Sequence, residues 1–144
     1  GGLRPGGVDV IVSEWMGYCL LYESMLPSVL VARDLLLAEG GTLFPDMSSM
    51  FFSGWRDGSD PVLPGRVAWW KSVHGIDLSA MIPMAWEPYG QEASVEVLDP
   101  AQICTDRHTL RAFNLNTVLD KDLDFEVPFS LTLATEGPLH GFVA

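Results

Sequence analysis

Two glutamates, Glu14 and Glu23, stand nine positions apart in the stretch SEWMGYCLLYESML, residues 13–26. Glutamates of this kind usually belong to a solvated surface. The side chains between this pair are mostly apolar or aromatic, which predicts that the loop holds the carboxylates in a partly dry concavity. Two carboxylates in a low dielectric repel each other unless a cation bridges them. A guanidinium is the natural bridge, because it is planar, permanently charged and carries donors in a fork that matches carboxylate geometry.

The pair lies between a predicted strand and a predicted helix. The run VDVIVS, Val8 to Ser13, is short, continuous and β-branched, as in parallel strands that are buried on both faces. Glu14 therefore follows the carboxyl end of a strand, where open α/β sheets bind their ligands. Apolar spacing predicts a helix from about Glu23 to Glu39, with Pro27 in its first turn and Gly40–Gly41 as its stop.

The rest of the chain divides into three further segments. Thr42 to Trp55 is predicted to return as a strand, and Arg56 to Gly65 is a loop rich in Gly, Pro and Asp. Residues 66–90 have short helical patterns and a dense set of large side chains: Trp69, Trp70, Met81, Met84, Trp86 and Tyr89. Such side chains fill a core, which is their commoner fate, or form a patch that is buried against another subunit. From Ala93 onwards the sequence predicts successive β segments, with two strand-like runs around a turn at residues 136–138.

Composition limits the partners. The 144 residues include 19 acidic and 8 basic side chains, for a net charge of -11. That field repels nucleic acid and attracts cationic partners such as a basic peptide. No apolar run is long enough to span a bilayer. Cys19 and Cys104 lie far apart, and His74, His108 and His140 are scattered singly, so neither a disulfide framework nor a metal site is predicted.

Both ends of the sequence lead us to expect a fragment. The chain begins at Gly1 with a turn, GGLRPGG, directly before a strand typical of the middle of a sheet. It stops at Ala144 inside a strand-like run, which would leave a sheet edge exposed. We therefore expect residues to be missing on both sides.

The stretch SEWMGYCLLYESML resembles the double-glutamate hairpin of the protein arginine N-methyltransferases. VLVARDLLLAEGGTLFPD is similar to the helix and strand that follow it in that family, WWKSVHGIDLSAM to part of the dimerisation arm, and VEVLDPAQI to the entry of the β-barrel. The whole chain aligns in order. It resembles the type I enzymes and, in EVLDP and the form of the hairpin, the type 3 branch most. His74 and the loop RDGSDPVLPG depart from the family pattern, which concerns the geometry of the arm.

The resemblance implies an α/β fold, the end of a Rossmann-like S-adenosylmethionine-dependent methyltransferase domain, followed by a mostly β, barrel-like domain with a helical dimerisation arm. The implied domains are residues 1–45, which carry the hairpin, and residues 46–144, an incomplete barrel with its arm at about 56–92.

The resemblance also implies an activity: transfer of methyl groups from S-adenosylmethionine to guanidinium nitrogens of arginine in proteins, histones among them, with no metal. Glu14 and Glu23 match the two family glutamates, which are catalytic and clamp the substrate guanidinium. Met25 matches a methionine near the cofactor sulfur, and Met16 is assigned to substrate binding. For Met25 an ordinary core position at the start of a helix is an equal alternative.

The implied partners are arginine-containing protein substrates, basic and rich in Arg and Gly, and a second copy that docks through the arm. No direct contact with nucleic acid or membrane is implied, and the expected localisation is cytoplasmic, with the nucleus as a second compartment. The family's glycine-rich cofactor loop would precede Val8, and its Thr-His-Trp loop would follow Ala144. The fragment by itself is therefore expected to be inactive, and asymmetric dimethylation follows only from the likeness to type I enzymes.

Two other classes of function stay open at this point. A non-catalytic dimerisation partner would keep the hairpin and arm but bind no cofactor, and an intact upstream glycine-rich loop would argue against it. An acidic module that binds basic peptides would lose affinity only modestly when Glu14 or Glu23 becomes Gln, by an amount that shrinks with salt.

Overall fold

The computed structural model describes residues 2–58 and 63–144. For residues 88–90 it describes the backbone but not the side chains. Its described residues fall into two compact units. The first contains Gly1–Phe51, Thr109–Phe129 and Ala144, and the second contains Phe52–His108 and Ser130–Val143. The boundary predicted from the sequence, between residues 45 and 46, stays a prediction.

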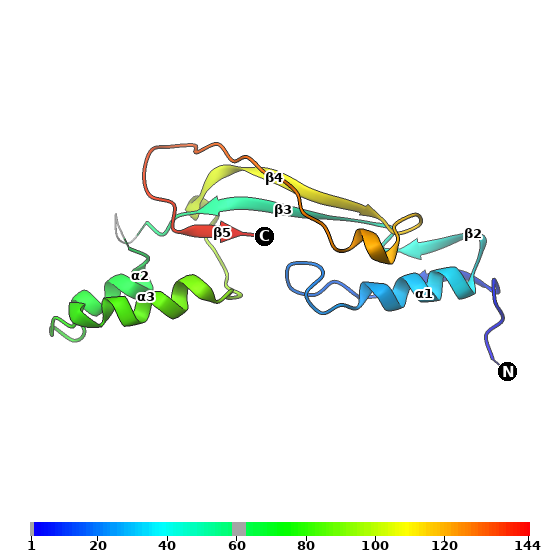
Figure 1. Ribbon diagram of the computed structural model, residues 1–144, viewed down its shortest axis with the longest axis horizontal. Coiled ribbons are helices and arrows are strands. Elements are labelled where there is room, and N and C mark those ends of the chain that lie inside the picture. The colour runs from blue at the N-terminus through cyan, green and yellow to red at the C-terminus, as the bar shows by residue number, and fades with distance from the viewer. Residues whose placement is uncertain (1, 59–62) are drawn as a thin grey trace. The chain divides into compact units, whose positions relative to one another are not determined.

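The first unit begins with a parallel strand pair. Strand β1 (Val8–Val12) pairs with β2 (Leu37–Phe44), and helix α1 (Leu26–Leu36) connects them and lies along the pair in Figure 1. A helical crossover is the usual way to join neighbouring parallel strands. The prediction of a short parallel strand that leads into a helix is confirmed.

The two faces of this strand pair differ in burial. Leu43 is buried and packs with Ile11, its register partner, in the core under α1. Because side chains alternate along a strand, Val10 and Val12 point the other way and are 50% and 76% exposed. The prediction that this strand is buried on both faces is therefore wrong for this chain, in which α1 covers one face.

Helix α1 is shorter than the apolar spacing predicted. It begins at Leu26 with Pro27 in its first turn. Ser24, two residues before the helix, has a left-handed φ of 53° and so cannot be part of it. It ends at Leu36, and β2 follows without a loop. Gly40 and Gly41 lie inside β2 and do not stop the helix, so the predicted bounds were too wide at both ends.

The core of the first unit joins segments that are far apart in sequence. Leu26, Val29 and Leu30 of α1 pack with Leu43 and with residues of a distant segment that follows residue 109. The buried members of this cluster are Trp15, Leu26, Val29, Leu30, Leu43, Phe113, Leu115 and Val118. The start of α1, through Leu26, and the loop before it, through Trp15, are thereby packed into the core of the first unit.

Strand β3 (Met47–Trp55) and strand β4 (Ile103–Asn114) are each divided between the two units. They form a three-stranded sheet with β5 (Gly141–Val143) in the order β4-β3-β5, and β5 pairs antiparallel with β3. The predicted single strand over Thr42–Trp55 is in fact the end of β2 and the whole of β3, since the pairing partner changes between them.

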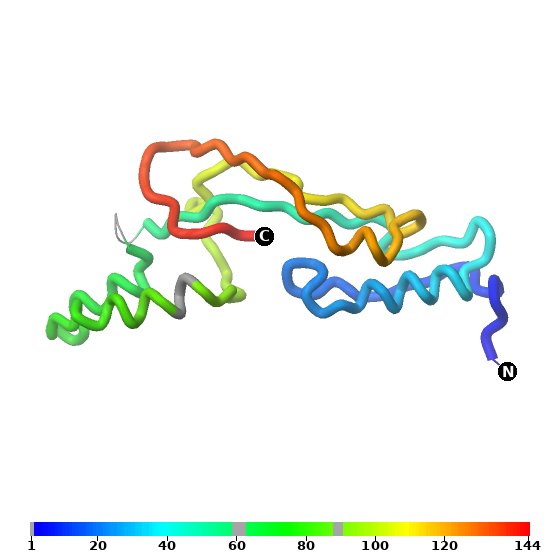
Figure 2. Tube along the Cα trace, in the orientation of Figure 1, coloured from blue at the N-terminus to red at the C-terminus, as the bar shows by residue number. Residues whose placement is uncertain are grey.

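The two strand-like runs predicted on either side of residues 136–138 lie at different places in the sheet. Residues 132–134 run along β4, as the path of the chain in Figure 2 shows. Ala134 N–H donates to Cys104 O (N–O 2.9 Å), and Asp106 N–H donates to Thr132 O (3.1 Å). β5 instead lies beside β3. The two apolar runs thus join opposite sides of one sheet and do not pair with each other.

The segment between β3 and β4 is helical in short pieces. Helix α2 (Gly65–Ala68) continues into a 3-10 turn, η1 (Trp69–Lys71), and a second turn, η2 (Ser79–Met81), leads into α3 (Ile82–Gln91). Residues 93–98 form no strand although a β segment was predicted there. They lead to a capped turn, η3 (Pro100–Gln102), from which β4 starts. No helix in the described part of the chain is long and apolar enough to cross a membrane.

Candidate active site

The loop between β1 and α1 carries both glutamates, and it leaves the sheet in an ordered way. Ser13 N–H donates to Phe44 O (N–O 3.0 Å), which extends the β1–β2 pairing by one residue. Trp15 is then 1% exposed and packs in the core of the first unit. Its neighbours Glu14 and Met16 are both exposed. Trp15 therefore acts as the anchor that turns Glu14 and Met16 toward solvent.

Sequence analysis treated Trp15 only as one of several apolar loop residues. The signal that distinguishes it is size, since burying an indole removes more apolar surface from water than burying any other side chain of this loop. Its indole nitrogen is buried and has no hydrogen-bond partner among the residues that the structure describes.

A tight turn follows the anchor. Gly17 and Leu20 form an isolated antiparallel bridge, in which Gly17 N–H donates to Leu20 O (N–O 3.1 Å). Cys19 and Leu20 have φ angles of 46° and 61°, which side chains with a Cβ rarely adopt. A second hydrogen bond, from Tyr22 N–H to the carbonyl of the residue four positions earlier (3.1 Å), closes the loop back on itself.

This turn folds Glu23 back onto Gly17. A Cβ built on Gly17 would lie 2.7 Å from Cγ of Glu23, 2.9 Å from its Cβ and 3.0 Å from its Cδ. The second glutamate thus packs against a residue that is only three positions after Glu14. That the two glutamates approach each other stays a prediction.

Both carboxylates are exposed in this chain. The predicted dry concavity is therefore not formed by the described residues, because the loop buries Trp15 on one side and presents Glu14 and Glu23 on the other. An exposed pair keeps its hydration, so any cation that bound between the carboxylates would have to displace water from both.

Met25 occupies the N-cap position of α1 and is exposed, as is Met16. The alternative that Met25 is an ordinary core residue is wrong, since its neighbour Leu26 takes the buried position instead. Both thioethers are available on the same loop as the two glutamates.

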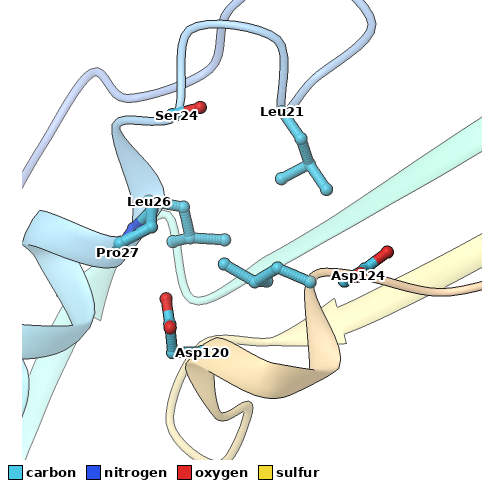
Figure 3. A pocket seen from close by; sticks show the side chains of 7 residues that line it. Leu21, Ser24, Leu26, Pro27, Asp120 and Asp124 are labelled. Carbon is cyan, nitrogen blue, oxygen red and sulfur yellow. The ribbon is translucent and has the colours of Figure 1, made fainter.

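A hollow of about 270 Å³ lies beneath the end of this loop. Figure 3 shows Leu21 and Leu26 pointing into it, with Asp120 and Asp124 at its edge. The full lining is Leu21, Ser24, Leu26, Pro27, Asp120, Leu123 and Asp124. The two aspartates belong to the turn η4 (Asp120–Asp122) and the residues just after it. No local sequence pattern predicts this role for the two aspartates, because their nearness to α1 depends on contacts across more than 90 positions of the chain.

Titratable groups elsewhere do not add a metal centre to this loop. No group of three or more His, Cys, Asp or Glu side chains in the described part of the chain is placed to hold a metal ion. His140, one of the singly scattered histidines, instead accepts a hydrogen bond at Nδ1 from Asp57 N–H (2.9 Å) and packs edge-on against Trp55. Its role in the second unit is structural.

Comparison with known proteins decides the family. The sequence model of the arginine methyltransferase oligomerization subdomain matches residues 48–144, about two thirds of the chain. The chain belongs to the protein arginine N-methyltransferase family. The predicted membership of this family is thereby confirmed.

Individual arginine methyltransferases are similar over nearly the whole chain. Protein arginine N-methyltransferase 1 of Caenorhabditis elegans is 41% identical over 142 residues, which cover 96% of this chain and 39% of the relative. The probable protein arginine N-methyltransferase 3 of Oryza sativa subsp. indica is 40% identical over 129 residues, 90% of this chain and 20% of the relative. These names belong to two branches, so the assignment to the type 3 branch stays a prediction.

A solved arginine methyltransferase shares the fold. The Trypanosoma brucei PRMT1 enzyme-prozyme heterotetrameric complex with AdoHcy aligns with a TM-score of 0.69 at 38% identity, over 92% of this chain and 39% of that one. This chain therefore spans about two fifths of the length of each of these two proteins, the nematode relative and the trypanosome enzyme. The coarser fold prediction, a mixed α/β and barrel-like architecture of this family, is confirmed.

Proposed function

We propose that this chain supplies the arginine clamp and an oligomerisation surface of a protein arginine N-methyltransferase. The observation that carries the proposal is that the loop between β1 and α1, in a chain of this family, buries Trp15 and leaves both Glu14 and Glu23 exposed. The finer fold assignment belongs to the same proposal: the first unit holds the end of a Rossmann-like domain, and residues of about 56–92 form a helical arm.

The clamp works by charge and orientation. Glu14 and Glu23 accept hydrogen bonds from the guanidinium of the substrate arginine, and each charge-assisted bond contributes about 1.5–3 kcal/mol. The two glutamates draw the positive charge of the guanidinium toward the nitrogens that they hold. The terminal nitrogen that they do not hold is left with more lone-pair character. Arginine stays protonated until it reacts, since its pKa lies above about 12. Fixed orientation of that nitrogen is the larger contribution to rate.

Methyl transfer needs a donor, which is S-adenosylmethionine in this family. The similar trypanosome complex holds AdoHcy, the form that remains after methyl loss. When bound, S-adenosylmethionine supplies a methyl group activated by a positively charged sulfur. Met25, exposed at the start of α1 beside Glu23, offers that sulfur a soft contact without a competing charge, and Met16 lines the substrate side.

The short helices of the second unit support self-association. Trp69 and Met84 are 52% and 68% exposed, and Ile76, Met81 and Trp86 are exposed beside them. Exposed apolar side chains in such number mark interaction surfaces. The matched family model is described as an oligomerization subdomain. We therefore assign this surface, the helical arm, to contact with a second copy of the protein.

The substrate is a basic protein segment rich in Arg and Gly. The net charge of -11 attracts such a segment. Asp120 and Asp124 add negative charge at the hollow beneath residues 13–25, the loop that carries Glu14 and Glu23, which we call the clamp loop. The proposed localisation of the protein is cytoplasmic, with the nucleus as a second compartment. Histones are among the proposed targets, and asymmetric dimethylation is the proposed product.

A non-catalytic partner is the second candidate, because the similar trypanosome complex pairs an enzyme with a prozyme. Such a partner would keep the arm, while its clamp would serve no turnover. The two candidates differ in what the loss of a clamp carboxylate does to methyl transfer.

The deciding experiment measures transfer of labelled methyl from S-adenosylmethionine to an Arg/Gly-rich peptide by the full-length protein. The Glu23→Gln variant is compared with Glu39→Gln, a matched change at an exposed glutamate in β2. An enzyme loses most, but not all, of its labelling in Glu23→Gln and keeps it in Glu39→Gln. Absence of labelling by the folded wild-type protein supports the non-catalytic partner, and equal labelling by both variants contradicts the clamp.

A further inference from the structure

We propose that Gly17 is a positioning residue that sets where the Glu23 carboxylate stands, an inference that rests on the proposed clamp. The observation is the close packing of the Glu23 side chain on the bare Cα of Gly17. A Cβ on residue 17 would lie 2.7 Å from Cγ and 2.9 Å from Cβ of Glu23. Both separations are shorter than real Cβ atoms show in proteins.

Gly17 is not needed for its backbone freedom. The described glycines with positive φ are Gly6, Gly40, Gly75 and Gly137, and Gly17 is not among them. Its φ lies outside the left-handed region that favours glycine, so the absence of a side chain is what this position requires. The space that a Cβ would fill is the space that Glu23 occupies.

Rotation of the Glu23 side chain does not relieve this contact. Its Cβ is fixed to the backbone, so residue 23 has to move as a whole when residue 17 gains a Cβ. The turn around it is tied by hydrogen bonds from Gly17 N–H to Leu20 O (N–O 3.1 Å) and from Ser24 N–H to Leu21 O (3.0 Å).

Strain makes this turn sensitive to such a movement. Cys19, Leu20 and Ser24 all have left-handed φ angles, 46°, 61° and 53°. Non-glycine residues keep such angles only where the surrounding structure over-determines them. Buried Trp15 on one side and buried Leu26 on the other supply that constraint. A Cβ at position 17 therefore shifts Glu23 within a turn that has few alternative conformations.

The consequence falls on the orientation of the bound arginine. A displacement of about 1 Å in a positioning group can cost about 10²-fold in rate. Gly17→Ala therefore lowers kcat of methyl transfer by up to about 10²-fold. The loss acts through Glu23, which distinguishes it from a general loss of stability.

The test is a double-mutant cycle in the full-length protein, with kcat and KM for an Arg/Gly-rich peptide and the Tm of each variant. Gly17→Ala is expected to lower kcat in the wild-type background and to change it less than about 2-fold in the Glu23→Gln background. Gly41→Ala is the matched control, because a Cβ there would lie 2.8 Å from Leu37 Cδ1, away from the clamp. It is expected to lower Tm while keeping kcat.

Two results would overturn the proposal: wild-type kcat and KM in Gly17→Ala, or an equal loss in both backgrounds. Equilibrium binding of the same peptide, measured in the presence of AdoHcy, separates this outcome from failure of the proposed function. If the wild-type protein transfers no methyl but binds the peptide, a weaker affinity in Gly17→Ala that disappears in the Glu23→Gln background upholds the role of Gly17. Unchanged peptide affinity, or no binding by the wild-type protein, overturns it.

Discussion

Nη1 of Arg33 donates a hydrogen bond to the backbone carbonyl oxygen of Leu115, 82 positions later in the chain, at an N–O distance of 2.7 Å. The same nitrogen donates to Val118 O, also at 2.7 Å, while the Arg33 side chain is only 9% exposed. Leu115 and Val118 are themselves buried members of the core. This guanidinium therefore ties α1, and with it the clamp loop, to the segment that follows β4.

Replacement of Arg33 by Met is expected to lower the free energy of unfolding by about 3 kcal/mol, because two carbonyls lose a charged donor. Arg33→Lys should recover part of the loss, since one ammonium cannot reproduce the fixed fork of donors. Urea denaturation measures both. Arg4→Met, at an exposed arginine, is the control and should change stability by less than about 0.5 kcal/mol. A similar loss at Arg4 and Arg33 would contradict the anchoring role.

Asp34 gives the protein a pH-dependent contribution. Arg33 Nε donates to its carboxylate at 2.7 Å, and this hydrogen bond lowers the pKa of Asp34 in the folded state. The contribution is therefore present above the unfolded pKa of about 3.9, and it is lost as the pH falls through the lowered folded pKa. Asp34 is 61% exposed, so the contribution stays below about 1 kcal/mol.

The measurement compares the free energies of unfolding of the wild type and Asp34→Asn between about pH 6 and pH 3. The difference should be constant at the upper end, shrink toward the lower end, and decrease with added salt. A difference that grows on acidification would show that the sign is wrong.

Local pattern predicted the order of elements in the first unit, and long-range contact decided the details that failed. The β-branched run at Val8–Val12 and the apolar spacing after Leu26 encode a strand and a helix within a few residues each. Gly40 and Gly41, by contrast, are helix stops by propensity, but pairing with β1 draws them into β2. Pairing energy outweighs a glycine's weak preference.

The clamp itself shows the same division. The residue types and spacing of Glu14 and Glu23, and the apolar character of the loop, are evident from the sequence alone. Which apolar residue became the anchor depended on the buried partners Phe113 and Leu115, about 100 positions away. The contact between Gly17 and Glu23 depends on left-handed φ angles at Cys19 and Leu20, which the backbone propensities of these two residues do not predict.

Gly54 should be the least replaceable glycine of the second unit. It is buried in β3, the central strand, and its N–H donates to Thr105 Oγ1 at 2.7 Å. A Cβ there would lie 2.6 Å from both Thr105 Cγ2 and Leu139 Cδ1. Leu139 is exposed and can turn away, whereas β-branched Thr105 is stiff.

Gly54→Ala is therefore expected to lower stability by about 1–3 kcal/mol, as measured by thermal or urea unfolding. Addition of Thr105→Ser should recover part of this loss, because it removes Cγ2 and keeps the hydroxyl acceptor. Gly58→Ala is the control, since a Cβ there meets nothing within 4 Å. No recovery in the double variant would show that Thr105 is not the obstacle.

The two cysteines should differ sharply in reactivity. Both are free thiols, but Cys19 is exposed in the clamp loop and Cys104 is buried in β4. A thiol reagent reaches a buried cysteine only when the structure around it opens, so its rate follows the free energy of that opening. Titration of the native protein with such a reagent is expected to show one fast thiol and one slow one, and urea should make both fast. Cys19→Ser should remove the fast phase and leave the slow one unchanged. A fast phase that survives in Cys19→Ser would mean that Cys104 is accessible, and that β4 opens more readily than its pairing with residues 132–134 predicts.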